Sequence, residues 1–418
     1  MPSPPIRSRR SYMQTVVLFF VCYSCLPTLS FAGDWPQILG PARNGKAEGE
    51  RLSKRWPSTG PQVVWQRKVG SGFAGVAVAE GRVVLWHRVD SQSIAEGVDA
   101  ATGNNLWKAS FPTSYTSTIS PDDGPRCVPL IHQNRVYLVG AQGDVHCVAL
   151  KDGRKLWSRD AFREFTAPEG YFGAGSTPIV EGNNLLMNVG GPGAGIVAFS
   201  LADGSTVWKS TDDAASYSSP TTFTIDGQRQ VIFTTRFNTI SINPANGKVH
   251  WQYPFGMRGP TVNAATPLVI DGHLFLSASY GIGARWLKLS SDHVDEAWES
   301  DEVMSSQYTT CVEHGGTLYG IDGRQDQGVA RLRAFDPQTR KVYWTKEGFG
   351  SGNLVLADNK LLILKIDGEL IMVEPSPKQY IELAKAKVLE TTAQALPAIA
   401  NGVLYVRDTD TLKALRLP

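Results

Sequence analysis

An eleven-residue segment that ends in tryptophan recurs along the chain and constrains the fold more than any other feature. Its copies are Gly97–Trp107, Cys147–Trp157, Ala198–Trp208, Ser241–Trp251, Lys288–Trp298 and Ala334–Trp344. Each copy reads as an apolar strand, a tight polar turn and a second strand that opens at the tryptophan. Successive tryptophans lie 50, 51, 43, 47 and 46 residues apart. This period, with about four strands per unit, is typical of a β-propeller blade.

The repeated tryptophans are predicted to hold neighbouring blades together. A four-stranded sheet cannot cover its own faces, so copies of it stack face to face around an axis. One indole per blade fills the gap between two sheets, because tryptophan buries about 200 Å². A stacking platform for a cofactor or a sugar is the alternative role, but the regular spacing favours packing. The expected structural docking residues are Trp65, Trp107, Trp157, Trp208, Trp251, Trp298 and Trp344.

Eight apolar runs predict the central strands of eight blades. They are Val83–Trp86, Val136–Val139, Leu185–Asn188, Val231–Thr234, Leu274–Ser277, Leu318–Gly320, Leu361–Leu364 and Val403–Val406. The seventh unit lacks the tryptophan strand, and its segment Ile381–Val388 has a locally helical pattern.

The two ends of the repeat region complete each other. The eighth unit reaches the end of the chain with three strands, whereas residues 63–69 form a strand without a blade. Pairing this strand with the C-terminal blade removes an open sheet edge. The sequence therefore predicts an all-β fold, an eight-bladed β-propeller of four-stranded antiparallel blades closed by the N-terminal strand 63–69.

The first 32 residues have the pattern of a signal peptide. Arg7, Arg9 and Arg10 precede an apolar run from Val16 to Leu26 that is too short to span a membrane. Export through a Sec signal or a twin-arginine signal remains open. We expect a signal peptide over 1–32, an extended N-terminal arm over 33–62 and the propeller over 63–418. The protein is thus expected to be exported to the periplasm or outside the cell, as a monomer without a transmembrane segment.

The net charge limits the class of partner that the mature chain is expected to bind, and the cysteine positions indicate free thiols. Cleavage after residue 32 removes three of the 41 Lys and Arg and none of the 39 Asp and Glu, which leaves a net charge of −1. A near-neutral surface gives no reason to expect binding to nucleic acid. The mature chain keeps Cys127, Cys147 and Cys311. Strand spacing places the first two too far apart for a disulfide, so buried free thiols are expected.

One rim of the predicted ring carries the long loops, where binding residues are usually found. Strand alternation puts the connections between blades, and those between second and third strands, on this rim. Its expected long loops are 87–97, 110–126, 158–175, 252–263, 279–286 and 321–331. Arg and aromatic side chains around a channel mouth suit a carboxylate, a sugar or a peptide. The candidate ligand or partner residues are His87, Arg88, Arg126, Tyr171, Phe172, Arg236, Arg258, Tyr280, Arg285, Asp322, Arg324 and Asp326.

No catalytic motif is found in the sequence. It has no HExxH, GxSxG or Walker pattern, and its seven histidines are scattered singly. Neighbouring acids such as Asp122-Asp123 and Asp212-Asp213 are weak evidence of a glycosidase pair. We therefore expect no catalytic residues and no bound metal.

The repeat A-x-D-x-x-T-G-x-x-x-W resembles the tryptophan-docking motif of the PQQ-like (quinoprotein alcohol dehydrogenase-like) β-propeller superfamily. Gly97–Trp107 and Ala334–Trp344 match it best, and the resemblance covers Val63–Leu417. The superfamily implies eight blades and an extracytoplasmic location, but fold alone does not imply an activity.

Two branches of this superfamily imply different functions. The quinoprotein dehydrogenases hold PQQ and calcium above the axis, often with a disulfide between adjacent cysteines. This chain has no Cys-Cys pair and no identifiable calcium ligands. The BamB-like branch binds protein partners through loops and carries no cofactor. We expect a non-catalytic binding or scaffold module that engages an envelope protein or a small ligand without a cofactor. A PQQ- and Ca²⁺-dependent alcohol or sugar dehydrogenase is the alternative, and a carbohydrate-handling propeller is a third possibility.

Overall fold

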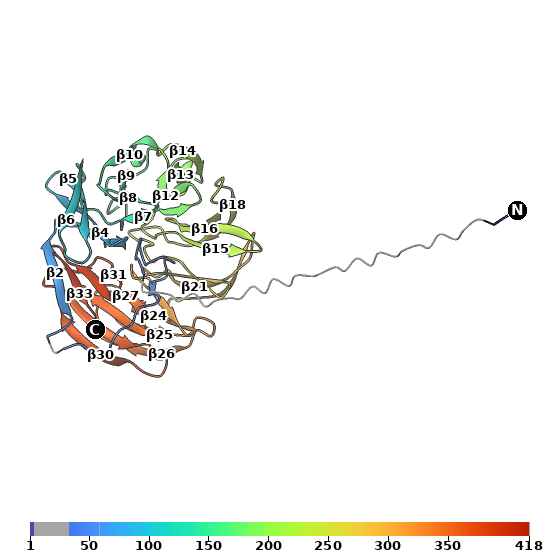
Figure 1. Ribbon diagram of the computed structural model, residues 1–418. Coiled ribbons are helices and arrows are strands. Elements are labelled where there is room, and N and C mark those ends of the chain that lie inside the picture. The colour runs from blue at the N-terminus through green and yellow to red at the C-terminus, as the bar shows by residue number, and fades with distance from the viewer. Residues whose placement is uncertain (4–32, 58, 418) are drawn as a thin grey trace.

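Eight sheets surround a common axis in the computed structural model, which describes residues 1–3, 33–57 and 59–417 (Figure 1). Consecutive strands are antiparallel neighbours within each sheet. First strands of adjacent blades contact one another at several seams, between β3 (Ala77–Ala79) and β7 (Leu130–His132) and between β3 and β31 (Ala398–Ala400) among others. The predicted eight-bladed propeller is confirmed.

The first four blades follow one another directly along the chain. Their strands are β3 (Ala77–Ala79), β4 (Arg82–Val89), β5 (Gln92–Asp99) and β6 (Asn105–Pro112); β7 (Leu130–His132), β8 (Arg135–Val139), β9 (Asp144–Ala149) and β10 (Lys155–Asp160); β11 (Ile179–Glu181), β12 (Asn184–Gly191), β13 (Ala194–Ser200) and β14 (Thr206–Ser210); β15 (Thr221–Ile225), β16 (Gln228–Thr234), β17 (Asn238–Ile242) and β18 (Val249–Pro254). Within the described residues the one helix is α1 (Ala161–Glu164), which follows β10.

The last four blades include two strands from the N-terminal region. Their strands are β19 (Leu268–Ile270), β20 (His273–Ala278), β21 (Gly283–Leu289) and β22 (Val294–Ser300); β23 (Val312–His314), β24 (Thr317–Asp322), β25 (Arg331–Phe335) and β26 (Val342–Lys346); β27 (Gly352–Ala357), β28 (Lys360–Lys365), β29 (Glu369–Glu374) and β30 (Ile381–Lys387), with β1 (Lys46–Ala47); β31 (Ala398–Ala400), β32 (Val403–Arg407) and β33 (Thr411–Arg416), with β2 (Gln62–Lys68). The helical pattern of residues 381–388 is misleading, because this segment pairs with β29 as a strand. The seventh sheet has five strands, since β1 pairs in parallel with β27.

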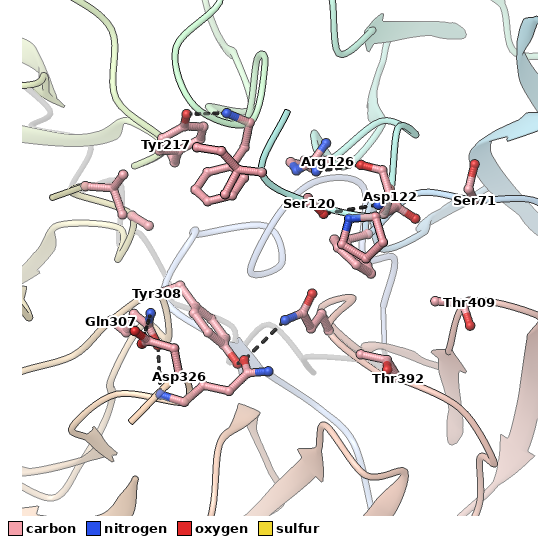
Figure 2. Close-up of a pocket in the computed structure, with 18 of the residues that line it drawn as sticks. Ser71, Ser120, Asp122, Arg126, Tyr217, Gln307, Tyr308, Asp326, Thr392 and Thr409 are labelled. Carbon is pink, nitrogen blue, oxygen red and sulfur yellow. Dashed lines mark hydrogen bonds between the residues drawn. The ribbon is translucent and has the colours of Figure 1, made fainter. Parts of the chain in front are cut away.

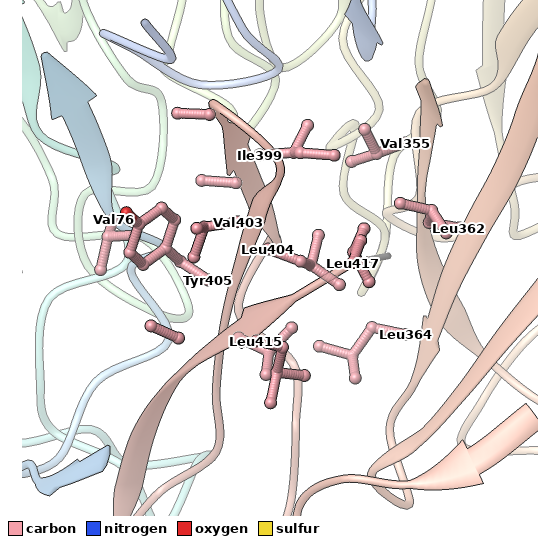
Figure 3. Packing of buried hydrophobic residues seen from close by; sticks show 14 of the residues in the cluster. Val76, Val355, Leu362, Leu364, Ile399, Val403, Leu404, Tyr405, Leu415 and Leu417 are labelled. Carbon is pink, nitrogen blue, oxygen red and sulfur yellow. The ribbon is translucent and has the colours of Figure 1, made fainter. Parts of the chain in front are cut away.

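The ring closes as predicted, through antiparallel pairing of β2 with β33. Trp65 lies opposite Ala414 in this pairing. A buried cluster from the seventh, eighth and first blades fills the seam, with Leu364, Leu404 and Leu415 at most 1% exposed (Figure 3). The last blade is thus packed on both faces, and its outer edge is occupied.

Each tryptophan of the repeat reaches its neighbouring blade because the outermost pairing is bulged. In the first blade Gly97 lies opposite Trp107 but the next partners are Val98 and Asn105, so one residue is extra. The Trp107 indole donates a hydrogen bond of 2.8 Å to the carbonyl of Leu150 in the second blade. Gly153 makes room for the ring, since an added Cβ there would lie 2.5 Å from it. A glycine in the turn of a repeat therefore leaves space for the indole of the preceding blade.

The seam between the fourth and fifth blades lacks this hydrogen bond from the indole. The indole nitrogen of Trp251 is buried and finds no hydrogen-bond partner in the described part of the chain. The carbonyl at the matching position, that of Ser291, instead accepts a 2.7 Å hydrogen bond from the side chain of Gln230. In the copy Lys288–Trp298 the carbonyl that would accept the preceding indole is therefore used by Gln230 instead.

All three cysteines of the described chain are free and buried, as predicted. Burial raises the pKa of the Cys127 and Cys311 thiols to about 12 and that of Cys147 to about 11. Cys127 precedes β7. The thiols act as small apolar side chains.

The two ends of the central channel are built from different connections. Turns between first and second strands, and between third and fourth strands, surround one end, which we call the arm end. The connections between blades, and those between second and third strands, surround the other, which we call the cup end. The names refer to what lies at each end, the N-terminal arm and a large cavity.

The N-terminal arm, residues 33–57, crosses the arm end. The backbone of Trp35 pairs with Val78 of the first blade. Further along, the Leu52 amide donates to the Asp358 carboxylate in the turn after β27, and Glu50 accepts from the Gly402 amide in the turn after β31. These contacts hold the arm to the first, seventh and eighth blades, which are neighbours in the closed ring, and Figure 1 shows the arm in blue near the centre of the ring.

Arg43 fixes the middle of the arm. Its side chain is 2% exposed and donates to the carbonyls of Thr177, Pro178 and Pro220 and to the side chain of Gln37. Burial lowers the pKa of this guanidinium to about 9. The carbonyls come from the third and fourth blades, so the arm reaches across the channel and closes its floor.

Candidate functional site

A cavity of about 1090 Å³ opens at the cup end of the channel (Figure 2). All of its lining residues come from connections between blades or between second and third strands. They are Val69, Gly70, Ser71, Phe73, Ile119, Ser120, Pro121, Asp122, Arg126, Phe172, Tyr217, Val262, Ala264, Tyr280, Gln307, Tyr308, Gln325, Asp326, Thr392, Gln394, Thr409 and Asp410. We call this cavity the cup.

One wall of the cup is a cation held between two aromatic rings. The Arg126 guanidinium lies 5.8 Å from the ring of Phe73 and 5.9 Å from that of Phe172. It donates to the carbonyls of Asp122 and Gly124, and no carboxylate in the described chain pairs with it. This wall therefore offers a positive charge and aromatic faces.

The opposite wall is a tyrosine surrounded by side-chain amides. The Tyr308 hydroxyl donates to Gln325 Oε1 at 2.7 Å, and Gln394 donates to the same oxygen at 3.2 Å. Burial raises the pKa of Tyr308 to about 12, so it is a neutral hydrogen-bonding group. Nearby, Gln307 donates to Asp326 Oδ1. Polar groups around an aromatic ring suit the binding of a neutral polar molecule.

Two of the three carboxylates that line the cup, those of Asp122 and Asp326, are paired within the fold, whereas the exposed Asp410 carboxylate has no partner among the described residues. Asp122 is 6% exposed and accepts the amides of Gly72 at 2.7 Å and Gly124 at 2.9 Å. Asp326 pairs with Arg324, whose charge and hydrogen bond lower the pKa of this carboxyl. Among the described residues no group of three or more His, Cys, Asp or Glu side chains could hold a metal ion.

A smaller cavity of about 270 Å³ adjoins the cup and shares Tyr217 and Val262 with it. We call it the side chamber. Its walls include Phe162, Ala214 and Asn188. The Tyr217 ring is held between the two cavities, because its hydroxyl accepts a 2.8 Å hydrogen bond from the Phe172 amide.

The structure places seven of the twelve predicted rim residues in the cup, the side chamber or a neighbouring hollow. Four line the cup: Arg126, Phe172, Tyr280 and Asp326. Tyr171 and Arg236 line the side chamber. Arg324 lines a neighbouring hollow of about 500 Å³ and lies 4.4 Å from the ring centre of Tyr280.

The other predicted residues lie outside these cavities. His87 and Arg88 are in β4, because the β4–β5 hairpin stays paired as far as Val89 and Gln92; the expected loop 87–97 is therefore wrong. His87 is 4% exposed and accepts from the Gly70 amide, while Arg88 donates to backbone carbonyls, Asp90 among them.

Of the three remaining predicted residues, two form ion pairs with other side chains of the fold and one is exposed outside the cavities. Asp322 ends β24, is buried and pairs with two arginines of β25. Arg285 lies in β21, shortening the expected loop 279–286, and pairs with Glu299. Arg258 is exposed beside Met257.

Residues that the sequence did not single out complete both cavities. Gln325, Tyr308 and Tyr217 lie in the long loops, but nothing in their local pattern separates them from other loop residues. Asn188 carried a signal that could have been used, since it is an amide within the apolar strand β12.

A hydrogen-bonded trio lies away from both cavities. His146 contacts Ser158 Oγ at 2.9 Å and Asp144 at 2.5 Å. The His146 ring also stacks on Phe111, with ring centres 3.8 Å apart. These residues couple β9 to β10 and to the first blade, and none of them lines a cavity described above. We interpret the trio as a packing feature.

The described residues include no helix with the length and apolar character needed to cross a bilayer.

A family model described as "Outer membrane protein assembly factor BamB" matches residues 90–346, more than half of the chain. No curated protein sequence matches.

Solved structures share the fold at low sequence identity. BamB from Moraxella catarrhalis is 15% identical with a TM-score of 0.61, over 85% of this chain and 97% of that chain. Quinohemoprotein alcohol dehydrogenase from Comamonas testosteroni is 13% identical with a TM-score of 0.65, over 94% of this chain and 81% of that one. The computationally designed Ika8 protein is 12% identical with a TM-score of 0.57, over 85% and 100%. At these identities the likeness concerns the fold alone.

Proposed function

This chain belongs to the BamB family of PQQ-like β-propellers, and on that premise we propose that it is an exported, non-catalytic binding module that engages its partner at the cup end. The observation that carries the proposal is the placement of exposed apolar side chains. Six of them surround the cup end: Val89, Ile119, Tyr171, Phe237, Met257 and Val329.

The arm end differs in this respect. The other large apolar side chains that are exposed in the described blades are Val63, Leu106, Val207 and Val342. Each is the first or second residue of an outermost strand, so these four lie apart from one another at the outer edge of the arm end. None of the described turns at the arm end carries one. Apolar side chains gathered on one face favour a protein partner there, and arginines such as Arg126 and Arg236 add polar contacts to the same face.

Site-specific photo-crosslinking tests this proposal. A photoreactive amino acid at Ile119 or Met257 should form a specific adduct with an envelope protein in intact cells. The same amino acid at Leu106 or Val342, which are exposed on outer strands, serves as the matched control and should form none. Equal adducts from both pairs, or none from either, would count against the proposal.

Export is tested separately. Cleavage of a signal peptide over 1–32 predicts that the protein recovered from the periplasm or the medium begins at Gly33. An intact Met1 terminus on a cytoplasmic protein would contradict export.

A PQQ-dependent alcohol or sugar dehydrogenase is the alternative function. Calcium takes six to eight oxygen ligands, with carboxylates among them, whereas Asp122 and Asp326 are occupied by backbone amides and an arginine. Among the described residues this leaves Asp410 as the single unpaired carboxylate of the cup. The residues of the cup thus do not fit a calcium-bound PQQ, and we propose that the cup works without this cofactor. Quinone absorbance retained after gel filtration with PQQ and Ca²⁺, together with substrate-dependent dye reduction, would overturn this view.

A further inference from the structure

The exposed charges differ between the two ends of the channel. In the connections that surround the cup end, eleven exposed side chains are carboxylates and two, those of Arg163 and Arg258, are guanidinium groups. In the described part of the arm and in the arm-end turns the exposed charges are balanced, with nine Lys or Arg and eight Asp or Glu. The eleven carboxylates of the cup end are those of Asp90, Glu164, Glu169, Asp212, Asp301, Glu302, Asp326, Glu347, Asp367, Glu390 and Asp410.

Most of these carboxylates are free of cations. Four pair with a neighbouring Arg or Lys, namely Glu164, Asp326, Glu347 and Asp367. The other seven form no ion pair with any described residue. Lys68, Lys346 and Lys387 are exposed too, but each is the last residue of an outermost strand and so lies at the edge of the ring. The loops of the cup end therefore carry an uncompensated negative charge.

Two of the unpaired carboxylates lie on adjacent loops of the eighth blade. The Glu390 amide donates a 3.1 Å hydrogen bond to the Asp408 carboxylate, in the loop that also carries Asp410. The hydroxyls of Thr391 and Thr409 join the same two loops at 2.8 Å. Neither the Glu390 nor the Asp410 carboxylate accepts a hydrogen bond from the described residues, so both are available to a partner.

Backbone pairing places Asp90 of the first blade next to these two loops. The Val69 amide donates to the Asp410 carbonyl at 2.9 Å, and the Ser71 amide donates to the Arg88 carbonyl, also at 2.9 Å. Asp90 follows Arg88 at the tip of the β4–β5 hairpin. Ser71 and Thr409 lie on the same side of the cup (Figure 2). One continuous surface therefore extends from the eighth blade to the first.

Exposed apolar side chains belong to the same surface. Val89 precedes Asp90 and is 40% exposed. Ile119 is 57% exposed and lines the cup, as Asp410 does. Its loop is held to the hairpin because Arg88 donates to the carbonyl of Asp123. We call the surface formed by Val89, Asp90, Ile119, Glu390 and Asp410 the acidic sector.

The arginines beneath the acidic sector point away from solvent. Arg407 is 1% exposed and donates to the carbonyls of Gly70 and Ala74, among others. The buried carboxylates of Asp122 and Asp408 lie close enough to Arg407 to raise its pKa, against the larger lowering by burial. These buried charges offset one another, so the exposed carboxylates dominate the surface.

We propose that the acidic sector binds a segment of the partner protein that carries Lys or Arg beside apolar side chains. Charges of opposite sign across an interface guide association and select the partner, and exposed apolar side chains provide the area to be buried. The inference rests on the proposed binding function and deepens it, because it names the place on the cup end and the chemistry of the partner.

Fluorescence anisotropy of the exported protein with two labelled peptides tests the inference. One probe is a peptide of Leu and Lys in equal number, and the other has Glu in place of every Lys. We expect the Lys peptide to bind at least about tenfold more tightly than the Glu peptide. Its affinity should fall as NaCl is raised from about 50 mM to about 300 mM, because salt screens exposed charges.

Two variants with equal changes in charge locate the binding surface. Asp90→Asn, Glu390→Gln and Asp410→Asn together should weaken binding of the Lys peptide about tenfold, since three unpaired carboxylates are removed. The control combines Asp226→Asn, Asp271→Asn and Glu48→Gln, at exposed positions of the arm end, and should change the affinity by less than about twofold. The inference is wrong if the two peptides bind equally, if neither binds, or if both variants lose the same affinity.

The photo-crosslink from Ile119 separates this inference from the proposed binding function. The partner peptide joined to this position, identified by mass spectrometry, should contain more Lys and Arg than Asp and Glu. A crosslinked peptide without this basic excess would reject the inference and leave the binding function standing. The absence of any adduct from Ile119 and Met257 would reject the binding function itself, and the inference with it.

Discussion

Two buried polar side chains, Arg43 at the arm end and Asn188 at the cup end, differ in how they are paired. At the arm end, the Arg43 guanidinium is surrounded by carbonyls of the third and fourth blades and by Gln37, so each acceptor around it has a donor. At the cup end, Asn188 is as deeply buried and has no partner in the described chain. A satisfied buried group stabilises one structure, whereas an unsatisfied one lowers stability unless something binds to it. Arg43 therefore supports the fold, whereas the unpaired amide of Asn188 is expected to lower its stability. Unpaired buried atoms are also found at the arm end, at Glu50 Oε1 and Trp56 Nε1 among the described residues.

Removing Arg43 is expected to have the largest effect. Arg43→Ala leaves at least three carbonyl oxygens without their donor and leaves a cavity beneath the arm, so it should lower the free energy of unfolding by about 3 kcal/mol. Denaturant unfolding followed by tryptophan fluorescence measures the change. Arg51→Ala, at an exposed position of the same arm, should change it by less than about 0.5 kcal/mol. A loss below about 1 kcal/mol in Arg43→Ala would mean that the arm does not depend on this network.

Two glycine substitutions distinguish the cost of backbone strain from the cost of a steric clash with an indole between two blades. Gly153 and Gly272 both have positive φ, +70° and +74°. An added Cβ at Gly153 would lie 2.5 Å from the Trp107 ring, whereas at Gly272 it would meet nothing within 4 Å. Gly153→Ala should therefore cost about 2–3 kcal/mol and Gly272→Ala about 1 kcal/mol. Equal losses of stability in the two variants would show that Gly153 is not needed to leave space for the Trp107 ring.

Two tryptophans test the same contrast, because the indole nitrogen of one is hydrogen-bonded and that of the other is not, within the described chain. Trp107→Phe removes a hydrogen bond to the Leu150 carbonyl, but Trp251→Phe removes an indole nitrogen that has no partner among the described residues. Both variants lose similar ring area. Trp107→Phe should therefore be less stable than Trp251→Phe by about 1 kcal/mol, measured by chemical unfolding of the two variants side by side. The reverse order would contradict the assignment.

The smallest expected effect is a pH dependence at the cup end. Burial lowers the pKa of His87 below its ordinary value of 6.5, so near this pH the unfolded chain binds a proton that the folded chain does not. Stability should therefore fall as the pH drops below about 6.5. Thermal unfolding between pH 7 and 5.5 should show a smaller decrease in His87→Gln than in the wild type. An identical slope in both proteins would remove His87 as the cause.

The fold was predictable because its determinant is repeated. A tryptophan every 43 to 51 residues and eight apolar strands specify the blades, and the count of strands at the two ends specifies the closure. The local pattern failed where tertiary pairing decided the outcome. His87 and Arg88 resembled loop residues but continue a paired hairpin, and residues 381–387 form a strand because β29 offers an edge.

The candidate site was predictable only in part. Long loops pointed to the correct rim, and Arg126, Phe172, Tyr280 and Asp326 do line the cup. Whether a loop side chain faces the cavity depends on contacts between blades, such as the Arg324–Tyr280 stack, and a linear pattern does not contain them. Asn188 was missed for a different reason, because it occupies a strand where packing usually explains each residue.

The most direct test of the contrast between Arg43 and Asn188 is the free energy of unfolding of ligand-free Asn188→Leu relative to the wild type. Because neither amide atom of Asn188 has a partner among the described residues, leucine removes an unpaired buried amide at similar volume, and the variant should be as stable as the wild type or more stable by about 1 kcal/mol. A loss of about 2 kcal/mol or more would show that the amide supports the fold, and Asn188 would then not differ from Arg43 as we infer.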